Sequence, residues 1–310
     1  MRHLVIIVSY NNEHHIADAI GSVMAQAEPV AECVIVDNGS ADRTQQIAQE
    51  QIANDTRFRL LSKTNEGPSA GRNHGLNNSQ PSETVTFLDG DDLLDPYFLQ
   101  RLGSHLAEHP ACGLVACQFE RIGENGNPLG PGFRSRFAPG LLGIPHQLPA
   151  SEIRTPFVTF FCATGQGPFA MFRRSVLERT PLYDESLWSH EDCDIFCQMS
   201  LRSEVHFLPD RLYIKREHAH NLTKTGRSDY GEFRKKWDHY HLAHPEFTSP
   251  VISARRYYYH LHRPLRDFKV AVKSAKLFCK EPSAAKLRWT LTLLKSGIRG
   301  LLRLENIPEL

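Results

Sequence analysis

Three aspartates stand together where an apolar stretch of the chain ends: Asp89, Asp91 and Asp92, with Gly90 after the first. The preceding segment, Thr84–Leu88, is apolar and β-branched, which predicts a buried strand. Carboxylates this close repel one another, and a divalent cation such as Mg²⁺ or Mn²⁺ relieves the repulsion. Gly90 would let the backbone turn tightly so that Asp89 and Asp91 face one ion. The alternative is an acidic turn in which Asp92 caps a helix.

The segments around this cluster alternate between strand-like and helix-like patterns. Strands are predicted at Leu4–Ser9, Cys33–Val36, Phe58–Leu61 and Thr84–Leu88. Helices are predicted around Ile16–Val23, from a cap at Ser40 or Asp42 to about Gln51, and from an N-cap at Ser69 to about Asn77. This alternation predicts an α/β fold with a mostly parallel, doubly wound sheet.

Polar residues follow each predicted strand, and in such sheets ligands bind beyond the carboxyl ends of the strands. They are Ser9-Tyr10-Asn11, Asp37-Asn38, Asn65-Glu66 and the aspartate cluster. A phosphate group could lie near a helix N-terminus, where free N–H groups favour anions. The chain has neither a G-x-G-x-x-G motif after its first strand nor a G-x-x-x-x-G-K-[ST] motif, which argues against an NAD(P) enzyme and a P-loop NTPase.

Several of these segments together resemble a known family. Val34–Ser40, Asn65–Gly67 with Gly71–Gly75, and Phe87–Asp92 look like successive motifs of family 2 glycosyltransferases. The resemblance covers about residues 3–224. It implies the GT-A fold, an α/β fold with a doubly wound mixed sheet. It also implies an inverting transfer from a nucleotide-sugar donor with a divalent metal, Mn²⁺ or Mg²⁺.

The resemblance assigns roles on the donor side of the site. The residues expected to bind the nucleotide sugar are Ser9, Tyr10, Asn11, Asp37, Asn65, Gly67, Arg72, Asp89 and Gly90. Asp37 would accept a hydrogen bond from a pyrimidine N–H, which favours UDP or dTDP donors, although it could simply stabilise a turn. Arg72 would lie near the phosphates, where its planar cation suits an anion, although it could be a solvated helix charge. Asp91 is the expected direct metal ligand, with Asp89 beside it.

A second acidic pair, Glu191 and Asp192, precedes an amphipathic segment. The pair could simply complement a helix dipole. Inverting transfer to a hydroxyl, however, needs a base that takes the acceptor proton. The resemblance assigns that base to Asp192 and acceptor binding to Glu191, and the two roles could be exchanged.

The segment Tyr213–Thr223 looks like the R-x-H-x-x-N-x-[ST] segment that closes the family's catalytic domain. His218 would contact the metal or the diphosphate, and His220 could substitute for it. The Q-x-x-R-W motif of processive members is missing near Gln198–Arg202. A single sugar addition is therefore expected rather than polymerisation.

We expect two domains: a catalytic domain at 1–225, with the donor side at 1–95 and the acceptor side at 96–225, and a basic helical extension at 226–310. The acceptor is expected to contact Phe133–Thr164, which is rich in Gly, Pro and aromatic residues. From Val251 onward there are 13 Lys and Arg against 4 Asp and Glu, whereas the whole chain has a net charge of only +1. The extension could bind an anionic membrane surface or pack in a dimer.

The sequence thus predicts a glycosyltransferase that uses a UDP-sugar or dTDP-sugar. Its acceptor would be a glycan or lipid-linked saccharide of cell-surface polysaccharide or glycolipid synthesis, and no nucleic acid partner is expected. Seven scattered cysteines and no long apolar run predict a cytoplasmic protein, with a peripheral place at the inner face of the membrane as an option. The alternatives are an inactive sugar-binding scaffold of the same fold and a nucleotidyltransferase.

Overall fold

The computed structural model describes residues 1–132, 169–219, 221–222, 229, 231–233 and 235–236. The chain divides into two compact units, Met1–Phe247 and Thr248–Leu310, and every described residue belongs to the first. The expected acceptor segment at Phe133–Thr164 lies outside the described residues. So does the predicted extension, apart from a few positions between 229 and 236. Both remain predictions.

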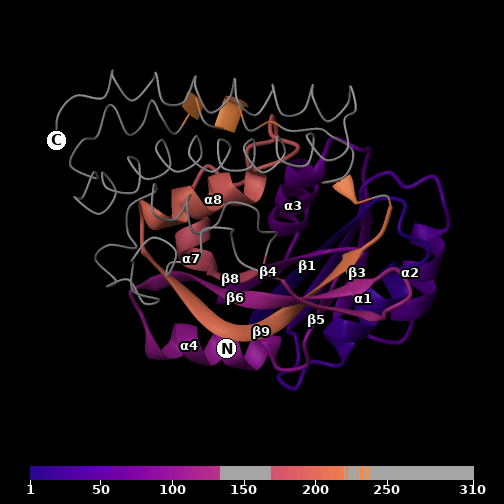
Figure 1. Ribbon diagram of the computed structural model, residues 1–310, viewed down its shortest axis with the longest axis horizontal. Helices are drawn as coiled ribbons and strands as arrows, with labels where there is room; N and C mark the ends of the chain where they lie inside the picture. The colour runs from indigo at the N-terminus through magenta and orange to yellow at the C-terminus, as the bar shows by residue number, and fades with distance from the viewer. Residues whose placement is uncertain (133–168, 220, 223–228, 230, 234, 237–310) are drawn as a thin grey trace, which may run out of the picture. The chain divides into compact units, whose positions relative to one another are not determined.

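A mixed sheet of nine strands forms the framework, in the order β3-β2-β1-β4-β8-β6-β9-β5, with β7 paired to β6 (Figure 1). The strands are β1 (His3–Ser9), β2 (Glu32–Asp37), β3 (Phe58–Ser62), β4 (Thr84–Asp89), β5 (Leu93–Leu94), β6 (Cys112–Gly123), β7 (Pro128–Gly132), β8 (Ala170–Arg173) and β9 (Glu204–Glu217). The first four are parallel, as the sequence predicts, so their carboxyl ends share one edge. β8 runs antiparallel to both β4 and β6, which makes the whole sheet mixed.

Helices cover both faces of the sheet (Figure 1). They are α1 (Ile16–Met24), α2 (Thr44–Ile52), α3 (Pro68–Asn77), α4 (Phe98–Glu108), α7 (Arg174–Leu177) and α8 (Glu191–Ser200). Residues of α1, α2 and α4 share one apolar core, and residues of α3, α7 and α8 share the other. The central strand β1 supplies both, with Val5 and Ile7 in the first and Leu4 and Ile6 in the second. A strand buried on both faces needs this continuous apolar sequence.

None of the helices among the described residues has the length and apolar character that a bilayer crossing needs.

The start of α3 differs from the prediction of a cap at Ser69. The helix begins at Pro68, after Gly67 in a left-handed conformation with φ +95°. Proline suits the first helical position because its fixed φ fits the helix and its missing N–H would have no partner there. Ser69 is therefore inside the helix, and its Oγ donates to the carbonyl oxygen of Leu187 at 2.9 Å. This bond ties α3 to the segment that leads into α8.

Gly90 is required for space and not for an unusual backbone angle. The tight turn expected there is present, since the N–H of Asp92 donates to the carbonyl oxygen of Asp89 at 3.0 Å, but Gly90 forms it without a positive φ. A Cβ at this position would instead lie 2.6 Å from Oγ of Ser9 and 2.9 Å from Nδ2 of Asn12. The end of β4 can approach the end of β1 because residue 90 has no side chain.

The long strand β9 runs beside β6 along the whole length of that strand (Figure 1). Its first residues pair with the start of β6, as Val205 with Leu114, and its last residues pair with the end of β6, as Lys215 with Arg121. Because β6 is parallel to β9 and antiparallel to β8, which is antiparallel to β4, the far end of β9 lies at the edge where β4 ends. β9 thereby delivers residues 215–218 to the aspartate cluster.

Candidate active site

Arg72 connects the two acidic clusters. It lies in α3, and its Nη2 donates to Oδ1 of Asp89, the last residue of β4, at 2.9 Å. Its Nη1 donates to Oε1 of Glu191, the first residue of α8, at 2.8 Å. Nη1 also lies 3.8 Å from Oδ1 of Asp192. The carboxylates that the sequence singled out in two separate segments therefore lie on either side of one guanidinium group.

Burial and the attraction between opposite charges act against each other at Arg72 and Asp192. The side chain of Arg72 is only 2% exposed, which by itself lowers its pKa, but the attraction of Asp192, Asp89 and Glu191 raises the pKa well above its ordinary value. Arg72 is therefore a permanent cation. Burial also raises the pKa of Asp192 well above its usual value, and the opposing attraction of Arg72 is the smaller effect.

Asp192 has an oxygen that accepts no hydrogen bond from the described residues. Its side chain is 12% exposed, and Oδ1 is buried without a hydrogen-bond partner in the described structure. A buried carboxylate oxygen without a partner is uncommon, because an unsatisfied buried polar group costs about 1–3 kcal/mol. An oxygen of this kind, with raised proton affinity, is suited to accept a proton from a bound hydroxyl.

Asp91 is held by the segment after β9. Its Oδ2 lies 2.8 Å from Nε2 of His218 and accepts from Nδ2 of Asn221 at 3.2 Å. Asn221 also uses its Oδ1 to accept from the backbone N–H of His218 at 2.8 Å, which fixes the turn that carries the imidazole. His220, the expected substitute for His218, lies outside the described residues.

Asp92 does not cap a helix. Its Oδ2 accepts from the hydroxyl of Tyr213 at 2.9 Å, and its Oδ1 accepts from the backbone N–H of Arg216 at 2.8 Å. Arg216 in turn donates to the carbonyl oxygen of Asp91 at 3.1 Å and to Oδ2 of Asp18 at 2.8 Å. Both oxygens of Asp92 are therefore committed to fastening β9 to the aspartate segment.

The aspartate cluster has the donors of a cation site. Carboxylate oxygens of Asp89, Asp91 and Asp92 lie within 4.8 Å of one another. Among the described residues, Oδ2 of Asp89 and Oδ1 of Asp91 accept no hydrogen bond, which leaves one oxygen of each for an ion. Oxygen donors of this kind suit a hard cation such as Mg²⁺ or Mn²⁺.

The expected donor-side residues at the ends of β1 and β2 lie next to one another. The backbone N–H of Asn38 donates to the carbonyl oxygen of Ser9 at 2.8 Å. Oδ1 of Asp37 accepts from the backbone N–H of Ser40 at 3.3 Å, so this carboxylate does stabilise a turn. It is 3% exposed as a residue. The turn uses one of its oxygens.

The loop before α3 joins the same group. Nδ2 of Asn38 donates to Oδ1 of Asn65 at 3.2 Å and to the carbonyl oxygen of Gly67 at 3.1 Å. On the β1 side, Oδ1 of Asn11 accepts from the backbone N–H of Ala41 at 2.8 Å. The fold therefore brings the polar ends of three strands to one edge.

Tyr10 is 48% exposed there. An exposed aromatic ring at this edge offers a surface on which a planar base could stack.

Comparisons with known proteins identify the family. The sequence model described as glycosyl transferase family 2 matches residues 4–180, more than half of the chain. The chain belongs to glycosyl transferase family 2.

Among its relatives is the uncharacterized glycosyltransferase EpsJ of Bacillus subtilis, 27% identical over 230 residues, which are 71% of this chain and 62% of EpsJ. Another is the minor teichoic acid biosynthesis protein GgaA of the same organism, 30% identical over 208 residues, which are 64% of this chain and 43% of GgaA. The chain thus spans less than two thirds of the length of these two relatives.

Solved structures show the same fold. TarS 1–349 of S. aureus, in complex with UDP-GlcNAc, matches with a TM-score of 0.60 and 18% identity, over 97% of this chain and 81% of that one. The mannosyltransferase PcManGT from Pyrobaculum calidifontis, in complex with GDP-Man and Mn²⁺, matches with a TM-score of 0.57 and 19% identity, over 99% and 88%. The family 2 glycosyltransferase described here therefore has the GT-A fold that the sequence resemblance implies.

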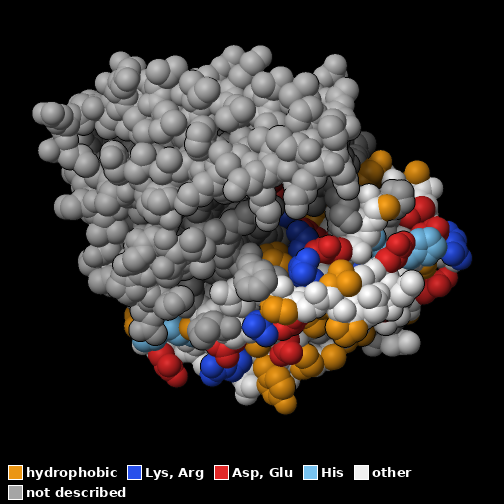
Figure 2. Space-filling model, in the orientation of Figure 1, with side chains coloured by type: hydrophobic (Ala, Val, Ile, Leu, Met, Phe, Trp, Pro, Cys, Tyr) orange, Lys and Arg blue, Asp and Glu red, His pale blue; other side chains and the backbone are white. Residues whose placement is uncertain are grey.

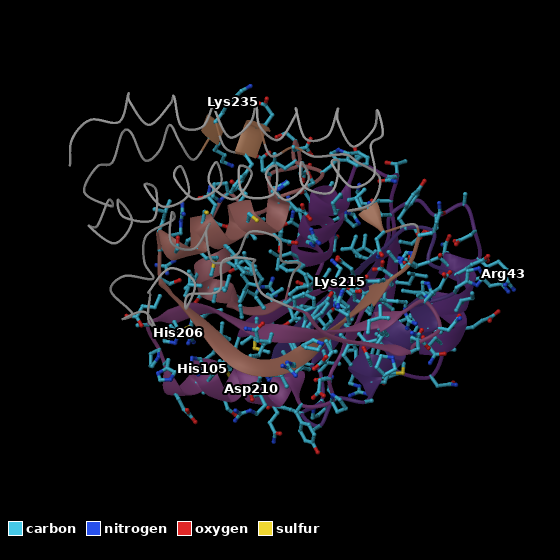
Figure 3. All side chains as sticks on the ribbon, in the orientation of Figure 1. Arg43, His105, His206, Asp210, Lys215 and Lys235 are labelled. Carbon is cyan, nitrogen blue, oxygen red and sulfur yellow. The ribbon has the colours of Figure 1, made fainter. Side chains whose placement is uncertain are left out.

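One charged residue of this family 2 glycosyltransferase was not singled out from the sequence. Lys215 lies near the end of β9 (Figure 3), and its charge lowers the pKa of Asp192, an effect smaller than those of burial, Arg72, Glu191 and Asp89. It acts in the same direction on Asp89 and Asp92. In Figure 2, basic and acidic side chains lie side by side in the middle of the described surface. The signal in the sequence was the basic pair Lys215-Arg216 just before His218.

Proposed function

We propose that this glycosyltransferase transfers one sugar, with inversion, from a UDP-sugar or dTDP-sugar to a hydroxyl group of a glycan or lipid-linked saccharide. The observation that carries the proposal is the unpartnered Oδ1 of Asp192, 3.8 Å from Arg72, which also binds Asp89 of the aspartate cluster. Arg72 thus lies between Asp192, the proposed base, and Asp89, one of the proposed ligands of a metal ion that would bind the diphosphate.

The donor nucleotide would lie across the edge formed by β1, β2 and the loop before α3. We assign Ser9, Tyr10, Asn11, Asn65 and Gly67 to its surroundings. Asp37 would accept from the ring N–H of a uracil or thymine base through the carboxylate oxygen that the turn at Ser40 leaves open. Gly90, which has no side chain to fill the space beside Ser9, would lie close to the ribose and diphosphate.

Asp89, Asp91 and His218 would hold the divalent cation. His218 now makes its 2.8 Å contact to Asp91 through Nε2, so direct ligation requires that this contact open. When bound, the cation would neutralise negative charge on the leaving nucleoside diphosphate. Lys215 adds a positive charge of the protein itself on the same side.

Asp192 would act on the acceptor. Its Oδ1 takes the proton of the acceptor hydroxyl while the hydroxyl oxygen bonds to C1 of the sugar and the bond from C1 to the diphosphate oxygen breaks. The guanidinium of Arg72, 3.8 Å from Oδ1 of Asp192, favours the ionised form of this carboxylate and offsets part of the rise in pKa that burial causes. Glu191, held by Arg72 at 2.8 Å, would position the acceptor through its second oxygen.

The biological setting is proposed to be the synthesis of a cell-surface polysaccharide or glycolipid. The name of GgaA as a teichoic acid biosynthesis protein supports this class of product. The basic segment after Val251 would suit an anionic membrane or a lipid diphosphate acceptor. Flotation with anionic vesicles at low and high salt tests this contact, because electrostatic adsorption weakens as salt screens it.

The deciding experiment uses the full chain and a panel of UDP-, dTDP- and GDP-sugars with Mn²⁺ or Mg²⁺. Thermal shift finds the donor, since a ligand that binds only the folded state raises the melting temperature. Proton NMR of the product made with that donor then reads the configuration at the anomeric carbon. We expect a pyrimidine donor and an inverted product. A GDP-sugar preference or a retained configuration overturns the corresponding part of the proposal, and pyrophosphate release would indicate a nucleotidyltransferase.

A further inference from the structure

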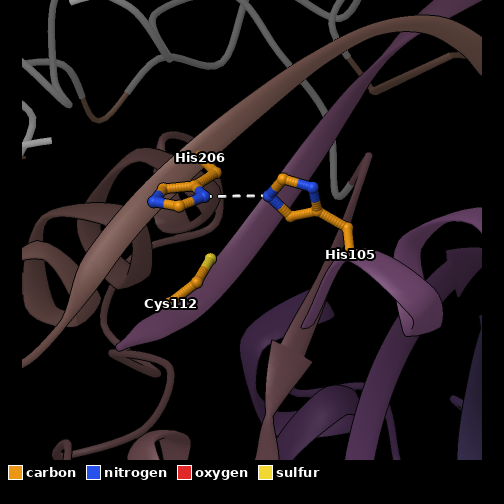
Figure 4. A group of neighbouring side chains, drawn as sticks. All are labelled: His105, Cys112 and His206. Atoms are coloured by element: carbon orange, nitrogen blue, oxygen red, sulfur yellow. Dashed lines mark hydrogen bonds between the residues drawn. The ribbon is translucent and has the colours of Figure 1, made fainter. Parts of the chain in front are cut away.

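A cluster of nitrogen and sulfur donors lies outside the acidic site. It consists of His105 in the last turn of α4, Cys112 at the start of β6 and His206 near the start of β9. One donor atom of each lies within 4.8 Å of the other two, and in Figure 4 the sulfur of Cys112 points toward the two rings. The cluster lies where β6 and β9 begin, whereas the acidic site lies where β4 ends. Figure 3 shows the two histidines well separated from Lys215.

Hydrogen bonds already orient His206 as a ligand would be oriented. Its Nε2 lies 3.2 Å from Oε2 of Glu204, so Nε2 carries the proton and donates to this carboxylate. Its Nδ1 is then unprotonated, and the lone pair of Nδ1 accepts a hydrogen bond from Nε2 of His105 at 2.8 Å. A carboxylate behind a histidine fixes the ring and raises its basicity toward a metal, which is the usual support of a metal-bound imidazole.

A fourth candidate ligand, His109, lies nearby but outside the group whose donor atoms are all within 4.8 Å of one another, so its ring would have to turn toward the ion. The ring of His109 lies 4.2 Å from the ring of His105 and 5.3 Å from the ring of His206, measured between centroids. His105 and His109 are four residues apart at the end of α4, so their side chains project from the same face. Three imidazoles and a thiol thus lie together at the end of α4.

We propose that His105 Nε2, Cys112 Sγ and His206 Nδ1 bind a Zn²⁺ ion, with His109 as the fourth ligand. Two histidine nitrogens and a thiolate are donors that zinc prefers, and Mg²⁺ avoids them. Nitrogens bound to one tetrahedral zinc are roughly 3.3 Å apart. The present 2.8 Å between His105 and His206 must therefore open by about half an ångström.

Binding changes the protonation of two side chains. Sγ of Cys112 now donates to the carbonyl oxygen of Leu114 at 3.2 Å, and on binding it gives up its proton to solvent and becomes the thiolate ligand. His105 keeps its ring neutral by moving the proton from Nε2 to Nδ1. Because the ligands come from α4, β6 and β9, the ion would be structural and would fasten the end of α4 to the sheet.

Cobalt substitution tests the site directly. Co²⁺ would be added to metal-free full-length protein, and the thiolate-to-cobalt charge-transfer band would be followed in the near ultraviolet. We expect one equivalent of cobalt to develop the band and Zn²⁺ to abolish it. The band should be absent in Cys112→Ser and should need at least tenfold more cobalt in His206→Gln. The acidic site contains no cysteine and cannot produce this band.

Two controls separate this site from others in the chain. Cys193→Ser removes a buried cysteine of α8, and Asp91→Asn weakens the acidic site, and both should leave the cobalt band unchanged. A wild-type protein without the band, or a band that survives in Cys112→Ser, overturns the proposal. A second variant, His105→Gln, replaces a half-buried ligand and should fold normally because this side chain is not part of the core. Zinc should raise the melting temperature of the wild type and not that of this variant. No turnover is measured, so the result is independent of the proposed transfer.

Discussion

Nη1 of Arg72 lies 2.8 Å from Oε1 of Glu191, although 119 residues separate the two in the chain. The other terminal nitrogen of the same guanidinium binds Asp89 at 2.9 Å. Arg72 therefore connects the proposed donor and acceptor sides of the site through both terminal nitrogens of a planar, permanently charged group.

Replacing Arg72 should destabilise the protein strongly. Arg72→Ala leaves Glu191 and Asp192 buried without their counter-charge, and breaking a buried ion pair costs about 3–5 kcal/mol. Arg72→Lys keeps the charge but loses the fork that binds two carboxylates, so we expect an intermediate loss. The free energy of unfolding, from denaturant titration, measures both effects.

The matched control is Arg101→Ala. Arg101 forms an ion pair with Asp210 at 3.1 Å, but its side chain is 56% exposed. Exposed pairs contribute about 0–1 kcal/mol. If Arg72→Ala were no less stable than Arg101→Ala, the central role of the Arg72 pairs would be wrong.

Asp192→Asn should lower kcat by about 10² to 10⁴ with little change in donor KM, because the amide cannot take the acceptor proton. Glu191→Gln should instead raise the acceptor KM more than it lowers kcat. Asp210→Asn, a change of the same kind away from the site, serves as the control and should keep wild-type kinetics. Should Glu191→Gln suffer the larger loss of kcat, the two roles are exchanged.

The pH profile of the wild type gives a second measure of the base. Burial raises the pKa of Asp192, with Arg72 opposing. The base works only when ionised, so kcat should fall as the pH drops through this raised pKa. A profile that stays flat down to the ordinary range of an aspartate would rule out Asp192 as the group whose ionisation limits the rate.

Asp91→Asn should reduce the metal-dependent affinity for the nucleoside diphosphate by at least tenfold. The variant loses one negative charge and one carboxylate oxygen that could bind the ion. The amide oxygen can still accept hydrogen bonds from Asn221 and from the imidazole of His218 after that ring re-orients. Calorimetric titration of UDP with and without Mn²⁺ measures the difference. Chelation of the wild type should abolish transfer, and added Mn²⁺ or Mg²⁺ should restore it. Full activity in excess chelator would contradict the metal requirement.

The stability of the protein should fall as the pH drops below about 6.5, the ordinary pKa of histidine. His3 is fully buried, and burial lowers its pKa despite the opposing contact with Glu28. The unfolded chain takes up a proton that the folded chain resists, so acid favours unfolding. In the folded chain the neutral ring of His3 forms hydrogen bonds with Oγ1 of Thr84 at 2.7 Å and with Oε1 of Glu28 at 3.0 Å.

His3→Gln should therefore make the melting temperature less dependent on pH between 7.5 and 5.5, measured in chelator to keep bound metals out of the comparison. The dependence should shrink without vanishing, because burial lowers the pKa of other histidines too: His15, His105 and His190. His14→Gln, with a side chain that is 76% exposed, is the control. An unchanged slope in His3→Gln would show that the pKa of His3 is the same in the folded and the unfolded chain, contrary to the effect of burial.

The first half of the sheet could be predicted because its signals are local. Thr84–Leu88 is a run of β-branched and apolar residues, and the structure has β4 there. Its polar end, Asp89, lies at the edge where ligands bind in such sheets. The cap at Ser69 was wrong because Pro68 fixes the first turn one residue earlier.

The contacts between distant segments could not be predicted in the same way. The pairing of Arg72 with Glu191 depends on how α3 and α8 pack over the sheet, which no local pattern encodes. For the zinc site, the spacing of His105 and His109 on one helix face was visible in the sequence. Its third histidine, His206, comes 101 residues after His105 and joins only through the pairing of β9 with β6.

The position of β8 has a consequence for engineering. This four-residue strand lies between β4 and β6 and pairs with both, so the sheet continues across the boundary expected near residue 95. A fragment cut there would expose β4 as an unprotected edge and invite aggregation. Chimaeras that exchange acceptor specificity should therefore keep Ala170–Arg173 and Glu191 from the same parent as Arg72. The segments before and after residue 95 are interleaved in the sheet and are not interchangeable modules.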